Sequence, residues 1–266
     1  MKSKIFGIIS IKGGTGKTSL VSNLGMALAD EFNKKTLIVD ANFSAPNLGL
    51  HFGLINPETT IHDVLSNKVN PTGAIYEVTD KLHLMPASLT GRKVNYLKLK
   101  EKIGKLRRSY DIILLDSSPN LNEEIMATMM ASDQLLVVTN PDYPTLSTTL
   151  RAVKVAKQKE IPITGIIINK SRNKKFELTL HEIEEAAGVP VISVIRDHIK
   201  IQEGLAHNTP IVIYKSKSSP SIEIKKLAAS LINENYKDSR FFANFKNLFN
   251  KNLKKHEVNR EILKSG

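Results

Sequence analysis

The feature that most constrains this chain is the stretch from residue 10 to residue 19, which reads Ser-Ile-Lys-Gly-Gly-Thr-Gly-Lys-Thr-Ser. A short apolar run, residues 4–10, precedes it, and a helix-like stretch, residues 17–31, follows it. Glycines at 13, 14 and 16 let the backbone curl so that its N–H groups face phosphate oxygens at the start of a helix. A strand, a glycine-rich turn and a helix in this order predict a phosphate-binding loop.

This loop carries two lysines where one is enough. Lys17 is placed to reach the β- and γ-phosphates of a nucleotide, and the hydroxyl of Thr18 is placed to bind Mg²⁺. Lys12 lies five residues earlier, and one short loop rarely aims two ammonium groups at the same phosphates. We therefore expect Lys12 to reach the nucleotide of another subunit, which predicts a homodimer with ATP at its interface.

Composition narrows the class of protein. The chain has 266 residues, enough for one α/β domain with a single large core. It has no cysteine, which excludes disulfides, zinc-thiolate sites and thiol catalysis, and its seven histidines form no metal-binding pair. No apolar run approaches the roughly 20 residues needed to cross a bilayer, and the start of the chain does not resemble a signal peptide. We expect a cytoplasmic protein.

Basic residues exceed acidic ones, which gives a formal net charge of +12. Residues 236–266 hold eight lysines and arginines against three acidic residues, so the excess is densest at the C-terminus although the remainder is basic too. Attraction to nucleic acid and attraction to an anionic membrane are both consistent with this charge.

Short β-branched runs alternate with longer amphipathic stretches along the chain. The expected strands are residues 4–10, 36–40, 82–86, 112–116, 134–139, 163–169 and 191–196. The expected helices include residues 17–31, 95–108, 145–159 and 177–187. Several of the strands are apolar nearly throughout, as strands covered on both faces should be. This pattern predicts an α/β fold with a doubly wound, mostly parallel sheet, helices on both faces, and ligands at the carboxyl ends of the strands.

The sequence Lys-Gly-Gly-Thr-Gly-Lys-Thr at residues 12–18 resembles the deviant Walker A motif of the MinD/ParA family of P-loop ATPases. Residues 39–48, Val-Asp-Ala-Asn-Phe-Ser-Ala-Pro-Asn-Leu, are similar to the first switch of that family, and residues 110–119 are similar to its Walker B strand. Leu-Met-Pro-Ala-Ser at 84–88 and Thr-Asn-Pro at 139–141 match two further segments, closest to MinD-like proteins. The resemblance runs from residue 4 to about 236 and implies a P-loop NTPase domain over residues 1–236.

The resemblance implies ATP or ADP and Mg²⁺ as ligands. Asp40 and Asp116 would hold the metal through water, together with Thr18, and Asn169 matches the asparagine that reads adenine, with an amide that offers both a donor and an acceptor. A strand-end cap for Asp116 and a turn-forming role for Asn169 are the alternatives. Residues 194–198 depart from the adenine loop of the family, so we assign no base contacts there. The nucleotide-binding residues implied are Lys12, Gly13, Gly14, Thr15, Gly16, Lys17, Thr18, Ser19 and Asn169.

Asn42 is a departure with consequences for turnover. MinD relatives have aspartate at this position, where it helps to orient the attacking water. Asparagine keeps the hydrogen-bonding shape but cannot accept a proton, and phosphoryl transfer depends mostly on positioning and charge stabilisation. We expect slow ATP hydrolysis, with Lys12, Lys17, Asp40 and Asn42 as the catalytic residues. Asn42 is either a natural variant of the switch or a substitution that traps the ATP state.

Residues 240–255 form an amphipathic helix when projected at about 100° per residue. Phenylalanine on one face and lysine on the other are typical of an interfacial membrane helix, and MinD relatives carry a similar C-terminal helix. Docking on the domain or on a partner, and nucleic-acid binding, are the alternatives. The spacing of Val258, Ile262 and Leu263 suggests that the tail, residues 256–266, extends the helix. The expected membrane-facing residues are Phe241, Phe242, Phe245, Leu248, Phe249 and Leu253.

These features predict a MinD-like ATPase that dimerises on ATP and binds an anionic membrane surface reversibly through residues 237–266. Such a peripheral membrane protein would position or regulate a cellular assembly, as in cell division, with an activating or cargo protein that the sequence does not name. A ParA-like ATPase that binds DNA non-specifically as an ATP dimer is the alternative that we favour less. A nucleotide-dependent adaptor with little turnover is the third.

Overall fold

The computed structural model describes residues 3–89, 94–238 and 254–265. Within these residues a single eight-stranded sheet has the order β3-β4-β2-β5-β1-β6-β7-β8. All neighbouring strands are parallel except the short pair β3 and β4. The strands are β1 (Lys4–Ile9), β2 (Thr36–Ala41), β3 (Tyr76–Glu77), β4 (Leu82–Met85), β5 (Ile112–Ser117), β6 (Gln134–Thr139), β7 (Ile163–Ser171) and β8 (Val191–Arg196).

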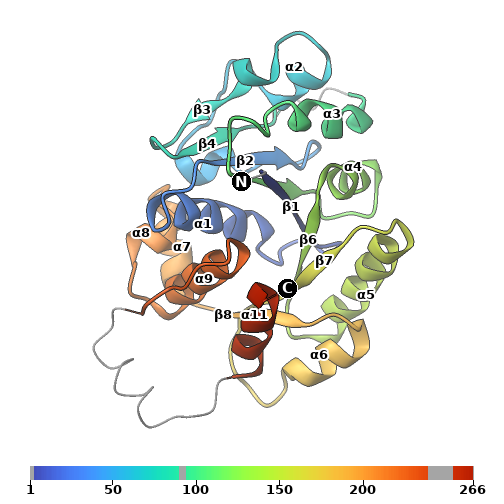
Figure 1. Ribbon diagram of the computed structural model, residues 1–266, viewed down its shortest axis with the longest axis vertical. Helices are drawn as coiled ribbons and strands as arrows, with labels where there is room; N and C mark the ends of the chain where they lie inside the picture. The colour runs from blue at the N-terminus through green and yellow to red at the C-terminus, as the bar shows by residue number, and fades with distance from the viewer. Residues whose placement is uncertain (1–2, 90–93, 239–253, 266) are drawn as a thin grey trace.

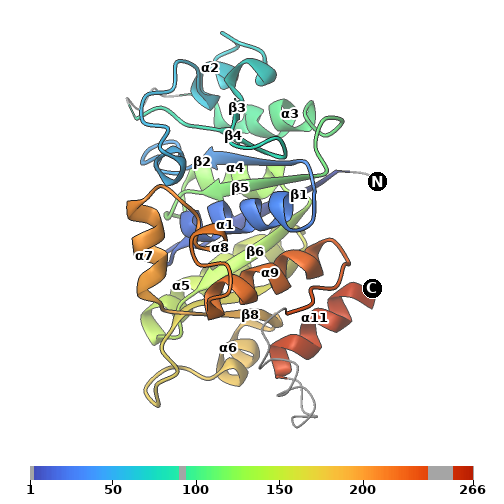
Figure 2. The same cartoon turned by 90° about the vertical axis from the view of Figure 1, so that its left-hand side faces the viewer.

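Helices cover both faces of this sheet (Figures 1 and 2). One group comprises α1 (Lys17–Asp30), α7 (Ile199–Ala206), α8 (Ile211–Tyr214), α9 (Ser219–Leu231) and α11 (Lys255–Ser265). The other group comprises α2 (Ile61–Leu65), α3 (Leu99–Gly104), α4 (Glu123–Ala131), α5 (Tyr143–Gln158) and α6 (Leu180–Ala187). Three 3₁₀ turns lie in the connections between strands and helices: Gly49–Phe52, Pro71–Ala74 and Tyr96–Lys98. The predicted doubly wound α/β fold is confirmed.

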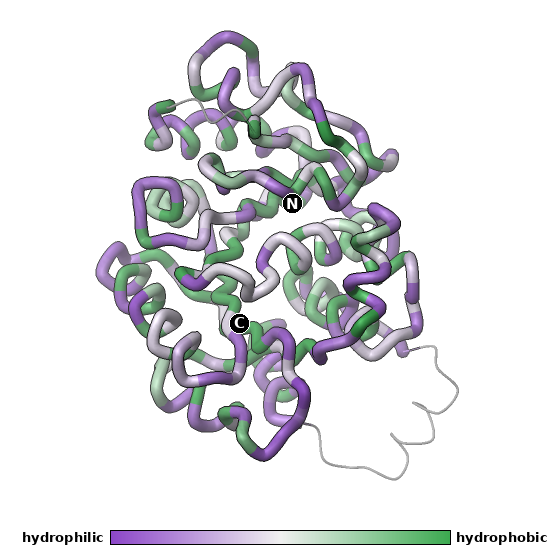
Figure 3. The backbone as a smooth tube through the Cα atoms, turned by 180° about the vertical axis from the view of Figure 1, so that it is seen from behind, coloured by the Kyte–Doolittle hydropathy of each residue, from purple (hydrophilic) through white to green (hydrophobic). Residues whose placement is uncertain are grey.

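Successive side chains of each strand point to opposite faces of the sheet and fill the hydrophobic cores on both faces. In β1, Phe6 and Ile8 pack in the cluster that contains α1 and α9, whereas Ile5 and Ile9 point to the clusters on the opposite face. All four side chains are essentially buried, because a parallel sheet with helices on both sides has no wet face. Figure 3 shows the same distribution, with apolar positions gathered in the strands and polar positions on the outer turns.

Two expected helices differ clearly from the observed ones, and α5 begins earlier than expected, at Tyr143 instead of Thr145. The stretch 95–108 is divided into the turn Tyr96–Lys98 and the short helix α3. Helix α6 begins at Leu180 rather than at 177, because Thr179 and Glu182 form a capping box at its start. The carboxylate of Glu177 instead accepts hydrogen bonds from Ser171 Oγ and Arg172 N, which holds the preceding loop.

The C-terminal region contributes one described helix, α11, which lies beside β8 and α9 (Figures 1 and 2). Its helical character agrees with the spacing of the sequence, and Leu263 packs against the core, but the other two apolar residues of that spacing do not. Val258 and Ile262 are 40% and 64% exposed, whereas His256 and Arg260 are 7% and 4% exposed. The reason is a buried acidic partner on α9, Glu223, which Arg260 contacts.

The six residues expected to face a membrane, Phe241 to Leu253, lie outside the described residues. In the part of the chain that the structure describes, no helix combines the length and the apolarity that crossing a bilayer requires.

Candidate nucleotide-binding site

The glycine-rich loop joins β1 to α1 at the carboxyl edge of the sheet. Gly14 and Gly16 have φ angles of 74° and 89°, a left-handed conformation that glycine adopts without strain. A Cβ atom on Gly16 would lie 2.3 Å from Nδ2 of Asn169, so this position has no room for a side chain. The loop then delivers Lys17 and Thr18 to the first turn of α1. The expected strand, loop and helix are therefore in place.

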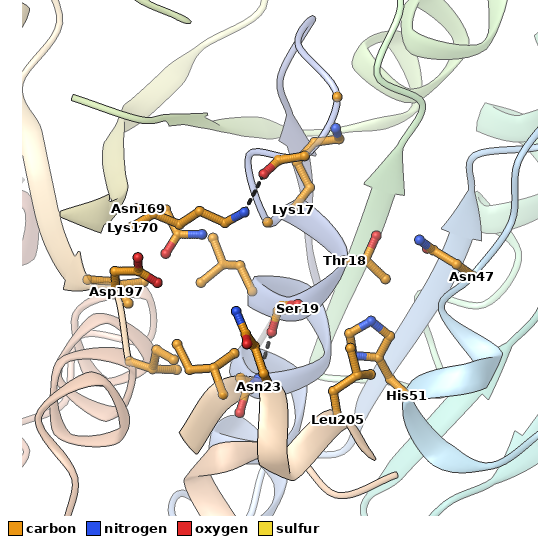
Figure 4. A pocket seen from close by; sticks show the side chains of 18 of the residues that line it. Lys17, Thr18, Ser19, Asn23, Asn47, His51, Asn169, Lys170, Asp197 and Leu205 are labelled. Carbon is orange, nitrogen blue, oxygen red and sulfur yellow. Dashed lines mark hydrogen bonds between the residues drawn. The ribbon is translucent and has the colours of Figure 1, made fainter. Parts of the chain in front are cut away.

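A pocket of about 390 Å³ opens above this loop, and we call it the nucleotide pocket. Figure 4 shows Lys17 and Thr18 at its centre, with His51 and Asn47 on one side and Asn169 and Asp197 on the other. Gly13, Gly14, Gly16 and Ser19 also line it, whereas Thr15 is fully buried beneath the loop. The pocket thus brings together residues from the loop, the first switch and the ends of β7 and β8.

The two candidate metal-binding carboxylates lie side by side on β2 and β5, where Asp40 is the register partner of Asp116. Both side chains are buried. Asp40 accepts hydrogen bonds from the backbone N–H groups of Asn42, Asn47 and Leu48 at 3.2, 3.0 and 3.0 Å. Neither oxygen of Asp116 makes a hydrogen bond of normal geometry among the described residues, although the Thr18 hydroxyl and the Lys17 ammonium are close enough to lower its pKa. A buried carboxylate with so few donors is expected to take a cation.

Electrostatics at this pair agree with a metal site. Burial and the charge of Asp116 raise the pKa of Asp40 to about 8, against the three backbone hydrogen bonds that lower it. Burial raises the pKa of Asp116 to about 6, against the Thr18 hydroxyl and the Lys17 ammonium, which lower it. No cage of three or more acidic or histidine side chains exists in the described ranges. The residues fit Mg²⁺, which commonly keeps waters and shares substrate phosphates with one or two carboxylates.

The two lysines of the loop lie in different surroundings. Lys17 is buried and lines the nucleotide pocket, and burial lowers its pKa while the charge of Asp116 raises it. Lys12 is 39% exposed and does not line the pocket. Its ammonium donates to Thr145 Oγ1 at 2.7 Å and lies 3.4 Å from Asp142 Oδ1, at the start of α5. One lysine therefore serves the pocket of its own chain, and the other lies outside it.

Asn42 lines the nucleotide pocket beside the metal pair. Its Nδ2 donates to the carbonyl oxygen of Ala45 at 2.5 Å, a bond that an aspartate could not make. Its Oδ1 is buried without a partner among the described residues, which leaves an acceptor for a water in the pocket.

The end of β7 braces the glycine-rich loop. Asn169 Nδ2 donates to the carbonyl oxygen of Thr15 at 2.8 Å, and Lys170 Nζ donates to that of Gly14 at 2.7 Å. Because a carbonyl can only accept, the first bond fixes the orientation of the Asn169 amide within the pocket. Lys170 has a φ of 56°, unusual for a residue other than glycine. Lys170 was not predicted from the sequence, where its only signal is its place beside Asn169.

His51 is another pocket residue that was not predicted from the sequence. It follows the first switch in the turn Gly49–Phe52, and its Nδ1 lies 3.1 Å from Ser22 Oγ on α1. Burial lowers the pKa of His51 to about 4, so the ring is neutral at physiological pH. The contact joins the turn after the first switch to the helix that follows the phosphate-binding loop.

Comparisons with known proteins agree with this site. Residues 3–163 match the AAA domain family. An uncharacterized ATP-binding protein of Methanocaldococcus jannaschii is 33% identical over 232 residues, which cover 86% of this chain and 88% of the relative. Among solved structures, the cell division ATPase MinD of Pyrococcus furiosus has a TM-score of 0.80 and 32% identity, over 85% of this chain and 97% of the other.

A second solved structure, the septum site-determining protein MinD of Pyrococcus horikoshii complexed with Mg-ADP, has a TM-score of 0.80 and 31% identity. The match covers 86% of this chain and 96% of that one. The fold, the two-lysine loop and these similarities lead to one conclusion. The chain belongs to the MinD/ParA family of deviant Walker A P-loop ATPases.

Proposed function

We propose that this protein is a MinD-like ATPase that dimerises on binding ATP, associates reversibly with an anionic membrane surface, and hydrolyses ATP slowly to position or regulate a cellular assembly. The observation that carries the proposal is the separation of the two lysines. Lys17 lines the nucleotide pocket, whereas Lys12 lies outside it and is partly exposed. In the proposed dimer, Lys12 contacts the phosphates bound by the partner.

Within one subunit the loop residues bind the phosphates. Backbone N–H groups of the loop and the ammonium of Lys17 donate to phosphate oxygens, and Thr18, Asp40 and Asp116 hold Mg²⁺ directly or through water. When bound, the metal neutralises phosphate charge. Because both pKa values of the acidic pair are raised, the site favours a cation over two bare carboxylates.

In this proposal hydrolysis is slow because the amide of Asn42 can orient a water but cannot accept a proton from it. Its free Oδ1 can accept a hydrogen bond from a water and orient it. The amide cannot take up the proton of that water, and its Nδ2 is bonded to Ala45. Positioning remains while proton acceptance is lost, which predicts low turnover rather than none.

Membrane association is proposed for the segment from residue 237, with the six apolar residues Phe241 to Leu253 facing the lipid. One basic amphipathic helix binds a bilayer weakly. Two on one dimer act at high effective concentration, so ATP-driven dimerisation converts weak contacts into durable attachment, and hydrolysis reverses it. The protein would then be cytoplasmic and peripherally membrane-associated, with an activating or cargo protein still to be identified.

Vesicle sedimentation of the full chain tests this function, with anionic vesicles and either Mg-ATP or Mg-ADP. Deletion from residue 237 is a poor control, because it also removes Arg260, which is buried against the domain. A better variant replaces Phe241, Phe245 and Phe249 by serine. Its matched control replaces Asn244, Asn247 and Asn250 by serine on the opposite side of the segment.

We expect the wild type and the asparagine control to sediment with vesicles in Mg-ATP, and the phenylalanine variant to stay in solution. Equal sedimentation of the wild type in Mg-ATP and Mg-ADP would argue against nucleotide control. A parallel titration with linear DNA tests the ParA-like alternative. Binding that falls steeply with salt and is unchanged by the phenylalanine substitutions would favour DNA.

A further inference from the structure

Helix α11 is clamped to the ATPase domain by a buried ion pair. Arg260 Nη1 lies 2.5 Å from Glu223 Oε1 on α9, and the two side chains are 4% and 14% exposed. The same Nη1 donates to the carbonyl oxygen of Ile192 on β8 at 3.2 Å. A single arginine of the C-terminal helix therefore contacts both a helix and the last strand of the sheet.

A second contact completes the attachment of α11 to β8. Asn259 Nδ2 donates to the carbonyl oxygen of Val191 at 2.8 Å and to Glu184 Oε1 at 2.6 Å. Lys255 also pairs with Glu184. Because β8 is the last strand in the sheet order, donors from α11 occupy carbonyl groups along the sheet edge in the described structure.

Glu223 of this ion pair also contacts the part of β8 that leads to the nucleotide pocket. Glu223 Oε1 accepts hydrogen bonds from Ser193 Oγ at 2.9 Å and Val194 N at 3.3 Å. Burial would raise the pKa of Glu223, yet the guanidinium of Arg260 and the hydrogen bond from Ser193 lower it overall. The carboxylate therefore remains charged and joins α9, β8 and α11.

The residues that follow Glu223 on α9 and Val194 on β8 form part of the wall of the nucleotide pocket. Ile224 follows Glu223 on α9, and Ile195 follows Val194 on β8, and both line the pocket. Asp197, just beyond β8, lines it too. Glu223 is thus the direct neighbour of one pocket residue on α9, and Val194, which donates to Glu223, is the direct neighbour of another on β8.

We infer that docking of α11 is energetically coupled to nucleotide binding through the Glu223–Arg260 pair. If α11 leaves, Glu223 loses its charged partner in a mostly buried place, and the ends of β8 and α9 lose the contact that holds them together. The pocket wall is then less well ordered for the nucleotide. By thermodynamic linkage, a nucleotide that favours the ordered wall also favours docked α11.

This inference rests on the nucleotide binding proposed above and not on membrane association.

The test uses the full chain without vesicles. Arg260→Gln removes the charge of the pair, and Lys264→Gln is the matched control, because among the described residues Lys264 on the same helix bonds Glu261 and Asn235 and not Glu223. Affinity for Mg-ADP is measured by calorimetry, and protection of the α11 amides by hydrogen exchange. We expect Arg260→Gln to weaken Mg-ADP binding by about tenfold, within the usual range of coupling between sites, and Lys264→Gln to leave it unchanged.

Two results would overturn the coupling. The first is an Arg260→Gln variant with faster exchange in α11 and wild-type affinity for Mg-ADP. The second needs no variant and therefore does not depend on folding of the substituted chain: equal protection of α11 in the wild type with and without saturating Mg-ADP. Loss of vesicle binding affects neither readout, so failure of the membrane proposal is distinguishable from failure of the coupling.

Discussion

Lys12 and Asp142 form an ion pair that joins the phosphate-binding loop to the start of α5. The ammonium of Lys12 lies 3.4 Å from the carboxylate, which is also the N-cap of α5 and accepts a hydrogen bond from Thr145 N. Both side chains are about two-fifths exposed, so the pair lies at the surface rather than in the pocket. In the proposed dimer, Lys12 exchanges this carboxylate for a phosphate bound by the partner.

The exchange predicts a restraining role for Asp142. Asp142→Asn removes the charge that holds Lys12 but retains the N-cap, because asparagine caps as well as aspartate. Since an exposed ion pair is worth at most about 1 kcal/mol, we expect ATP-driven dimerisation to tighten by roughly two- to fivefold in analytical ultracentrifugation. Glu101→Gln, which removes the exposed pair with Lys105, is the control and should leave dimerisation unchanged.

Alanine substitutions at Gly14 and Gly16 are predicted to weaken Mg-ADP binding by different amounts. Gly16→Ala places a Cβ atom 2.3 Å from Asn169 Nδ2, whereas Gly14→Ala meets nothing within 4 Å. Both glycines have positive φ, so both variants carry about 1 kcal/mol or more of backbone strain, but only the first also displaces Asn169. Titration with Mg-ADP should show that Gly16→Ala binds the nucleotide at least about tenfold more weakly than Gly14→Ala does. Equal losses would contradict the bracing role of Asn169.

Asn42→Asp tests whether the side chain at position 42 limits the rate of ATP hydrolysis. The new carboxylate could accept a proton from water, so we expect the single-turnover rate with Mg-ATP to rise by about tenfold or more. Aspartate cannot donate to the Ala45 carbonyl, so hydrogen exchange in residues 42–48 should become faster. An unchanged rate would show that this position does not limit hydrolysis.

His51 predicts a pH dependence of stability. Burial lowers its pKa to about 4 in the folded chain, against the ordinary histidine value of 6.5. Below pH 6.5 the unfolded chain binds a proton that the folded chain does not bind until about pH 4, so the free energy of unfolding falls as the pH decreases through this window. Between pH 7 and pH 5 the contribution is about 1 to 2 kcal/mol.

The variant His51→Gln, which retains a partner for Ser22, should lose less stability than the wild type between these two pH values. Urea denaturation measures the difference. The exposed His181, replaced by glutamine in the control, should behave as the wild type does. A loss of equal size in both variants would exclude burial of His51 as the cause.

Local chemistry was readable from the sequence, whereas contacts between distant segments were not. The loop at residues 12–18 and the strand that carries Asp116 are each made of consecutive residues, and the structure forms both where they were expected, while the roles of their side chains stay predictions. Lys170 was missed because its role depends on a left-handed backbone and a contact with Gly14, 156 residues away.

The C-terminal helix shows the same limit. The spacing of Val258, Ile262 and Leu263 indicated a helix, yet it did not indicate that Val258 and Ile262 would be exposed and Arg260 buried. Periodicity reports which residues share a face, and it carries no information about a buried carboxylate supplied by another helix. The start of α6 was misplaced for a related reason, because the capping role of Thr179 outweighed the helical pattern from Glu177.

The central claim is that Lys12 acts across a dimer interface, and the most direct measurement is sedimentation of Lys12→Ala with Mg-ATP. The wild type should sediment as a dimer in Mg-ATP and as a monomer in Mg-ADP. We expect Lys12→Ala to remain monomeric in both while its Mg-ADP affinity stays within about threefold of the wild type, because Lys12 lies outside the pocket of its own chain. A Lys12→Ala protein that dimerises on Mg-ATP as readily as the wild type would contradict the account.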